Sequence, residues 1–211
     1  MKELRSSYKE NNYGNVFRAI VLSSNPKLIV ELGVLDGYSL FNLSNAVRCN
    51  VLERNLEGYI YAFDLWDNYR FKHGNMEEVR KMLIEEGLSS YVTLAKGDAF
   101  YVQNKFYDYS INLLHVDISN DGDKLIRILN LWENKLSDDG MIIFEGGSEK
   151  RDKVEWMIKY GKPSIRNELF NNRLVYKNWN FQIFDDFPSI TLLWKKIKCQ
   201  DGKKQIGING H

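Results

Sequence analysis

The sequence is poor in the residues that mark disulfide-rich, multi-domain or membrane proteins. Its only cysteines, Cys49 and Cys199, match no metal-binding spacing and no disulfide framework. Only three prolines occur, and we expect one domain over residues 1–198, followed by a polar tail over 199–211. No apolar run approaches membrane-spanning length, and the first ten residues lack an apolar signal core. These absences predict a cytoplasmic protein without a membrane partner.

The chain also lacks an excess of charge of either sign. Lys and Arg number 29 against 28 Asp and Glu, which gives a formal net charge of +1. Binding to a nucleic-acid backbone depends on clustered positive charge, so we expect no nucleic-acid partner. Hydrophobic residues make up 44% of the chain and charged residues 27%, a balance that is typical of a globular domain.

Short β-type runs alternate with helical patterns along the chain. Five runs have the apolar character of strands, and they cover 28–32, 59–63, 91–94, 111–116 and 141–144. Helical patterns follow at 39–47, 76–86 and 121–136, and a turn is expected at 137–140. This alternation predicts an α/β fold with a mostly parallel sheet and helices on both faces. Two further runs, 181–184 and 190–194, are too close for a helical crossover and should form an antiparallel hairpin.

Acidic residues stand at or near the carboxyl ends of all five predicted parallel strands. They are Glu31, Asp64, Asp98, Asp117 and Glu145. In an open α/β sheet, ligands bind outside these strand ends, where the connections diverge. The five acidic residues are therefore the first candidates for a ligand site.

The turn after the first strand carries Gly33 and Gly37, four residues apart. It lacks the closely spaced glycines that admit a dinucleotide pyrophosphate, and it lacks the lysine of a phosphate loop. The carboxylate of Glu31 suits a cation better than a phosphate, and Asp64 is placed to accept hydrogen bonds from ribose hydroxyls. The pattern favours a ligand with a ribose, a positive group and no phosphate, such as S-adenosylmethionine.

Three stretches of the sequence resemble a known family. Residues 30–39 (VELGVLDGYS) resemble the first motif of class I S-adenosylmethionine-dependent methyltransferases, and residues 61–66 (YAFDLW) resemble the second. Residues 113–117 (LLHVD) and 139–144 (DGMIIF) are similar to a passage of the small-molecule O-methyltransferases related to family 24 and to macrocin O-methyltransferase. The resemblance covers residues 12–196. It implies a Rossmann-like class I fold with a seven-stranded sheet that ends in an antiparallel hairpin.

The resemblance implies eight cofactor-binding positions for S-adenosylmethionine. They are Glu31, Gly33, Gly37, Ser39, Asp64, Asp98, Ala99 and Asp117. Glu31, Gly33 and Gly37 would line the methionine and ribose parts. Ser39 would open the following helix near the cofactor, and Asp64 would bind the ribose hydroxyls. Asp98 and Ala99 would lie near the adenine, and Asp117 would lie under the transferable methyl group.

The same resemblance raises the question of a metal ion. Metal-assisted members bind a divalent cation through an aspartate after the fourth strand and a pair of residues after the fifth. Asp117 matches the first place, but Glu145 is followed by Gly146, so one expected ligand is missing. A magnesium ion bound by Asp117 and Glu145 therefore stays an open alternative.

Three residues are candidates for the chemistry itself. His115 precedes Asp117 by two positions on one strand, so both side chains face the same side. We take Asp117, His115 and Glu145 as candidate catalytic residues. His115 would serve as the base for an acceptor hydroxyl or orient Asp117, and Glu145 is the second candidate for the base. The alternative for His115 is a core histidine with satisfied hydrogen bonds.

The sequence thus predicts transfer of a methyl group to an oxygen of a small molecule, such as a sugar or a glycosylated metabolite. The alternative is a methyltransferase-fold binding or regulatory protein without catalysis. A nucleic-acid or protein methyltransferase fits less well, because the charge is near neutral and no Asn/Asp-Pro-Pro-Tyr motif occurs. Residues 148–178, which include Arg151, should form a helical connection with a charged outer face. A homodimer stays open as an assembly.

Overall fold

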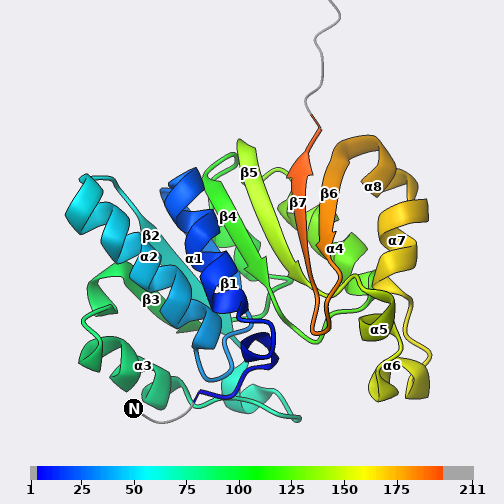
Figure 1. Cartoon of the computed structure of the whole chain (residues 1–211), viewed down its shortest axis with the longest axis horizontal. Helices are drawn as coiled ribbons and strands as arrows, with labels where there is room; N and C mark the ends of the chain where they lie inside the picture. The colour runs from blue at the N-terminus through cyan, green and yellow to red at the C-terminus, as the bar shows by residue number, and fades with distance from the viewer. Residues whose placement is uncertain (1–3, 197–211) are drawn as a thin grey trace, which may run out of the picture.

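The computed structural model describes residues 4–196, in which a seven-stranded sheet is packed against helices (Figure 1). The strands are β1 (Leu28–Leu32), β2 (Tyr59–Asp64), β3 (Val92–Lys96), β4 (Ile111–Val116), β5 (Leu136–Glu145), β6 (Trp179–Phe184) and β7 (Ile190–Lys195). Their order in the sheet is β3-β2-β1-β4-β5-β7-β6. The pairs among β1 to β5 are parallel, and β7 is antiparallel to both of its neighbours. The predicted fold class and the hairpin are confirmed.

Two layers of helices cover the sheet because the strand side chains alternate between two apolar cores. Ile29 belongs to the core beneath α1 (Tyr13–Ser24), α2 (Tyr38–Arg54) and α3 (Met76–Glu85). Val30 belongs to the core beneath α4 (Gly122–Trp132), α7 (Ile165–Asn171) and α8 (Arg173–Asn178). The remaining helical pieces are short: α5 (Glu149–Asp152), α6 (Glu155–Lys159), and the 3-10 helices η1 (Ser7–Lys9), η2 (Trp66–Asn68), η3 (Ser89–Tyr91) and η4 (Val102–Lys105).

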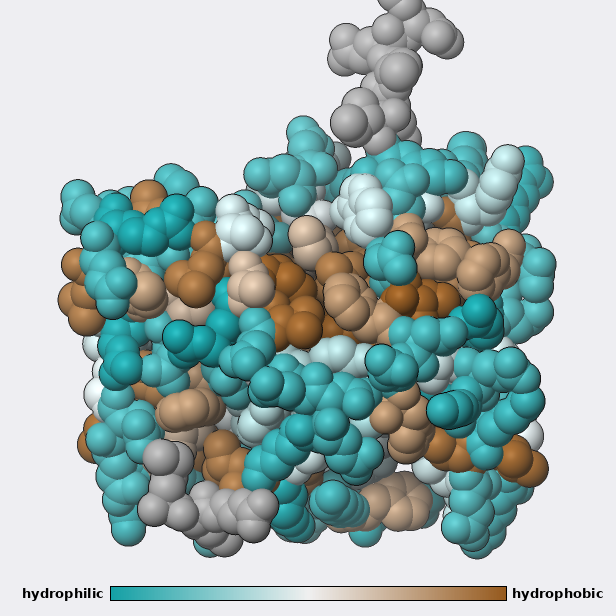
Figure 2. Space-filling view, viewed as in Figure 1, coloured by the Kyte–Doolittle hydropathy of each residue, from teal (hydrophilic) through white to brown (hydrophobic). Residues whose placement is uncertain are grey.

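One part of the sheet has helices on a single face. Figure 1 shows β5, β7 and β6 uncovered beside α1, and Figure 2 shows apolar side chains on this side of the molecule. Trp194 is 38% exposed there, and Met141 and Leu192 are partly buried. The predicted homodimer stays a prediction.

The structure corrects the prediction of a turn at 137–140, because these residues lie within β5. The pairing of β5 with β4 shifts register between Ile111 and Leu113. A Cβ atom at Gly140 would lie 2.9 Å from the carbonyl oxygen of Ser137. The chain therefore bends tightly here as an irregularity within a continuous strand, which produces turn-like residues without a turn.

Helix lengths also differ from the prediction. The helix after β1 continues to Arg54, beyond the predicted 39–47, because buried Asn50 donates a hydrogen bond to the carbonyl of Val21. A polar residue thus extends a buried face that apolar spacing alone does not reveal. The helix after β4 ends at Trp132. The predicted tail over 199–211 lies outside the described residues.

Within residues 4–196, no helix combines the length and the apolar character that a membrane-spanning helix needs.

Trp132 should contribute strongly to stability. It is fully buried, and its indole nitrogen donates to the carbonyl of Ala99 over 3.1 Å. We expect Trp132→Ala to lower the free energy of unfolding by about 3–5 kcal/mol, because it leaves a cavity in the core. Urea denaturation followed by circular dichroism measures this loss. Trp194→Ala, at a partly exposed position, is the control, and equal losses from the two variants would contradict the assignment of the core.

Candidate functional site

The carboxyl ends of β1 and β4 meet at the centre of the sheet. Glu31 pairs with His115 across the two strands, and the backbone N–H of Asp117 donates to the carbonyl of Leu32 over 2.8 Å. Gly33 has a φ angle of +89°, and a Cβ atom there would lie 1.9 Å from the carbonyl oxygen of Asp117. Only glycine permits this backbone conformation together with so close an approach. Four of the predicted site residues are therefore brought together.

A chain of hydrogen bonds passes through this centre. The hydroxyl of Ser39 donates to Glu31 Oε1 over 2.5 Å, and His115 Nδ1 lies 3.1 Å from the same oxygen. On the other side of the imidazole, Nε2 lies 3.3 Å from the hydroxyl of Tyr8. This hydroxyl also interacts electrostatically with the nearby carboxylate of Asp117. Glu31 and His115 are fully buried, and Tyr8 is nearly so. Reasoning from the sequence missed Tyr8, because it stands in a polar stretch that no motif marks.

Burial determines the electrostatics of this centre. It raises the pKa of Tyr8 well above its ordinary value, and the charges of Asp117 and Glu145 act in the same direction. Tyr8 is therefore a neutral hydroxyl. Burial also raises the pKa of Asp117, and His115 and Tyr8 oppose this rise. Glu31 Oε2 is buried and finds no hydrogen-bond partner among residues 4–196. A buried acceptor in this state is costly, and it suits a ligand that brings an N–H group.

Glu145, at the end of β5, is bound to Arg151 of α5. Arg151 Nε lies 2.5 Å from Glu145 Oε1, and Nη2 lies 2.8 Å from Oε2. Nη2 also donates to the carbonyl of Asn120 over 3.1 Å. Burial raises the pKa of Glu145 to about 7, and the guanidinium group opposes this rise. Arg151 is only 6% exposed, so its expected place on a charged outer face is wrong; the buried carboxylate accounts for its position.

The described residues do not support the predicted magnesium site. Between residues 4 and 196, no three His, Cys, Asp or Glu side chains are grouped so that they could bind a metal ion. Arg151 occupies both carboxylate oxygens of Glu145. The side-chain oxygen of Asn120 accepts from the backbone N–H of Ile118 over 3.3 Å, and its amide nitrogen donates to the carbonyls of Val116 and Glu145. The oxygens of Glu145 and Asn120 are thus engaged by other groups.

Asp64, at the end of β2, organises the turn that follows β1. Its Oδ2 accepts hydrogen bonds from the backbone N–H groups of Val34 and Leu35, over 2.7 and 3.0 Å. Its Oδ1 accepts from Trp66 N over 2.9 Å. A carboxylate oxygen has two acceptor sites, so Oδ1 has capacity for one more donor. The residue predicted to bind a ribose therefore also fixes the glycine-containing turn.

The turn after β3 is held from two directions. Asp98 Oδ1 accepts from Phe100 N over 2.8 Å, and the carbonyl of Ala99 accepts from the indole of Trp132. The predicted Gly37 caps the start of α2 with a φ angle of +84°. Because β3 pairs with β2, the turn after β3, which contains Asp98 and Ala99, lies beside the end of β2.

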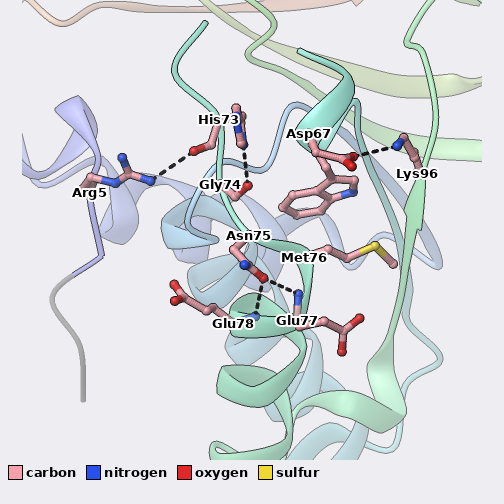
Figure 3. Close-up of a pocket in the computed structure, with 10 residues that line it drawn as sticks. Arg5, Asp67, His73, Gly74, Asn75, Met76, Glu77, Glu78 and Lys96 are labelled. Carbon is pink, nitrogen blue, oxygen red and sulfur yellow. Dashed lines mark hydrogen bonds and ion pairs between the residues drawn. The ribbon is translucent and has the colours of Figure 1, made fainter. Parts of the chain in front are cut away.

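A pocket of about 400 Å³ opens near the ends of β2 and β3 (Figure 3). Its walls come from the β2–α3 connection, the start of α3, the end of β3 and the segment before η1, and its lining residues are Arg5, Trp66, Asp67, His73, Gly74, Asn75, Met76, Glu77, Glu78 and Lys96. Lys96 and Asp67 form an ion pair of 2.6 Å in its wall. The pocket adjoins the predicted ribose and adenine positions, whereas Tyr8 packs at the Asp117 end of the site.

The contact between the two strand ends can be tested at Gly33. Gly33→Ala forces a Cβ atom against the Asp117 carbonyl in an unfavourable backbone conformation, and should lower the free energy of unfolding by about 3 kcal/mol. Gly161 also has a positive φ angle, +56°, but has no atom within 4 Å of a built Cβ. Gly161→Ala is therefore the matched control, with an expected loss of about 1 kcal/mol. Similar losses in urea denaturation would contradict the close approach at Gly33.

The buried ion pair gives a second test. Arg151→Met leaves the Glu145 carboxylate buried without a partner, so we expect a loss of about 3–5 kcal/mol in the free energy of unfolding. The double variant Arg151→Met, Glu145→Gln should be more stable than Arg151→Met alone, because it removes the buried charge of Glu145. Lys153→Met breaks only an exposed pair with Glu149 and should cost less than about 1 kcal/mol. If Arg151→Met costs as little as Lys153→Met, the pair is not buried in solution.

Similarity to known proteins agrees with this site. A family model described as a methyltransferase domain, of methyltransferase group 24, matches residues 30–145, just over half of the 211 residues. The matched range contains the ends of all five parallel strands. Among curated proteins, none matches the sequence.

Several solved structures share the fold. A methyltransferase from Podospora anserina bound to S-adenosylhomocysteine has a TM-score of 0.64 and 14% identity, over 87% of this chain and 77% of that one. The O-methyltransferase TomG from Streptomyces achromogenes, in complex with S-adenosylmethionine, has a TM-score of 0.63 and 14% identity, over 93% and 83%. An O-methyltransferase from Bacillus cereus has a TM-score of 0.60 and 14% identity, over 88% and 81%. With its strand order, its acidic strand ends and this family match, the chain belongs to the methyltransferase-domain family of class I S-adenosylmethionine-dependent methyltransferases.

Proposed function

We propose that the chain transfers a methyl group from S-adenosylmethionine to an oxygen of a small-molecule acceptor. The observation that carries this proposal is the acidic centre at the ends of β1 and β4. Glu31 has a buried oxygen without a donor, and Asp117 lies at the end of the neighbouring strand. Positive ammonium and sulfonium groups suit these carboxylates, whereas a phosphate would be repelled. The O-methyltransferases from S. achromogenes and B. cereus that share the fold support an oxygen acceptor.

The residues of the site fit each part of S-adenosylmethionine. Glu31 Oε2 would accept from the amino group, beside the hydroxyl of Ser39. Asp64 Oδ1 would accept from a ribose hydroxyl, since it has one acceptor site left. The turn of Asp98 and Ala99 would border the adenine next to the pocket. When bound, the cofactor supplies a methyl group activated by a positively charged sulfur.

We assign Asp117 to the acceptor. Asp117 is partly exposed, and its carboxylate interacts with the hydroxyl of Tyr8. Asp117 would take the hydroxyl proton of the acceptor, whose oxygen would receive the methyl group that S-adenosylmethionine supplies when bound. Most of the rate in such an in-line displacement comes from orientation of the two reactants. Glu145, whose carboxylate oxygens are bound to Arg151, takes no part in this proton transfer.

The net charge of the chain supports a small-molecule acceptor. The near-neutral chain offers little attraction to a polyanion, so a small molecule is favoured over a nucleic acid. We keep a sugar or a glycosylated metabolite as the proposed acceptor, and labelled methyl transfer to panels of sugars and phenols would identify it.

Cofactor binding is the first test. Calorimetric titration of the wild type with S-adenosylmethionine and S-adenosylhomocysteine should show saturable binding. Asp64→Ala should weaken binding by about tenfold or more, because it removes a ribose partner and loosens the turn after β1. Asp108→Ala is the control, since Asp108 is exposed and pairs only with Lys135 among its described contacts. We expect this control to bind as the wild type does.

Two results would overturn the proposal in different ways. A folded wild-type protein that binds neither ligand has no cofactor site. Binding without transfer to any acceptor, in a protein whose Asp64→Ala variant binds weakly, would favour the alternative of a binding or regulatory protein.

A further inference from the structure

We infer that Tyr8 is a positioning residue of the transfer site, which orients Asp117 and His115, and that residues 5–9 carry it there. The inference rests on the proposed function. Tyr8 lies outside residues 30–145, so the family match does not assign it. It is nevertheless among the largest fully buried side chains of the described residues.

The hydroxyl of Tyr8 lies between two side chains of the site. It is 3.3 Å from His115 Nε2, and it interacts electrostatically with the nearby carboxylate of Asp117. On its other side, the imidazole is held by Glu31 Oε1, 3.1 Å from Nδ1. A tyrosine hydroxyl donates one hydrogen bond and accepts others, so it can bond to both neighbours at once. Tyr8 thereby couples the orientation of the carboxylate to that of a rigidly held imidazole.

Aromatic packing fixes the ring that carries this hydroxyl. The ring of Phe17 meets the ring of Tyr8 edge-on, at 5.1 Å between centroids and 89° between planes. Tyr13 and His115 lie at 6.1 and 5.9 Å. Because these rings enclose the buried ring of Tyr8, its hydroxyl is held in one orientation beside His115.

Residues 5–9 are fastened to both loops that border the cofactor site. Arg5 Nε lies 2.5 Å from Asp36 Oδ2, and Arg5 Nη2 lies 2.7 Å from Oδ1. Asp36 belongs to the turn after β1. Nη2 also donates to the carbonyl of His73, in the β2–α3 connection, over 3.2 Å (Figure 3). Ser6 Oγ then accepts from Tyr8 N over 3.2 Å and starts η1. These contacts hold the segment so that Tyr8 is directed inward.

Tyr8→Phe isolates the hydroxyl, because the ring and its packing remain. We expect kcat to fall about tenfold or more, while KM and the calorimetric Kd for S-adenosylmethionine change less than about twofold. The thermal midpoint should stay close to that of the wild type. Tyr107→Phe removes the hydroxyl of a tyrosine that is 88% exposed, and this matched control should leave kcat unchanged. A purely structural Tyr8 would lower the thermal midpoint and leave kcat of the folded fraction unchanged.

Nitrogen-15 NMR of the imidazoles gives a readout that does not depend on catalysis. The chain has only three histidines, His73, His115 and His211, and His115→Gln identifies the signal of interest. Tyr8→Phe should shift the Nε2 resonance of His115 and leave that of His73 unchanged. Arg5→Gln, which unfastens the segment, should shift it in the same direction.

The outcomes separate this inference from the proposed function. An unshifted His115 signal in Tyr8→Phe overturns the contact, and a shifted signal with unchanged kcat overturns the positioning role. If the wild type binds no S-adenosylmethionine, the proposed function fails and the catalytic role of Tyr8 fails with it. A shifted signal would then support only the contact between Tyr8 and His115.

Discussion

The close approach of β1 and β4 at their carboxyl ends is the constraint on which the site depends. The positive φ angle of Gly33 lets the backbone pass the carbonyl of Asp117, where no side chain would fit. The same register sets Glu31 opposite His115 on one face of the sheet. β1 leads into α2 on that face and β4 leads into α4 on the other, so the connections diverge. A ligand site opens where such connections separate.

Burial of so many polar side chains requires that nearly all of them find partners. One hydrogen-bonded chain runs from Ser39 to Tyr8, and a second group joins Glu145 to Arg151. Among the described residues, Oε2 of Glu31 and Nη1 of Arg151 find no hydrogen-bond partner. Stability is therefore sacrificed at the point where the proposed amino group of a ligand would restore it, which is typical of sites built for binding. The remaining hydrogen bonds keep the surrounding side chains in fixed orientations.

Local patterns in the sequence suffice to predict the parallel strands of the core and the acidic residues at their carboxyl ends. Apolar runs and glycine positions are short-range signals, and the fold contains the strands and the turn that they predict. Contacts between distant residues leave no such signal: Tyr8 meets His115 across 107 positions of the chain. Arg151 was misjudged because a cation in a polar stretch is usually solvated, and only the end of β5 shows why it is buried. The irregular register around Gly140 is invisible for the same reason, since it depends on β4.

The region matched by the family model ends at residue 145, whereas the folded domain continues beyond it. β6 and β7 complete the sheet beyond it, Arg151 neutralises the end of β5 from outside it, and Tyr8 enters from before it. The range of residues matched by sequence similarity is thus shorter than the range that forms the sheet and the site. A chain trimmed to the matched residues would keep the glycine turn and lose the tyrosine and the arginine that complete the site around it.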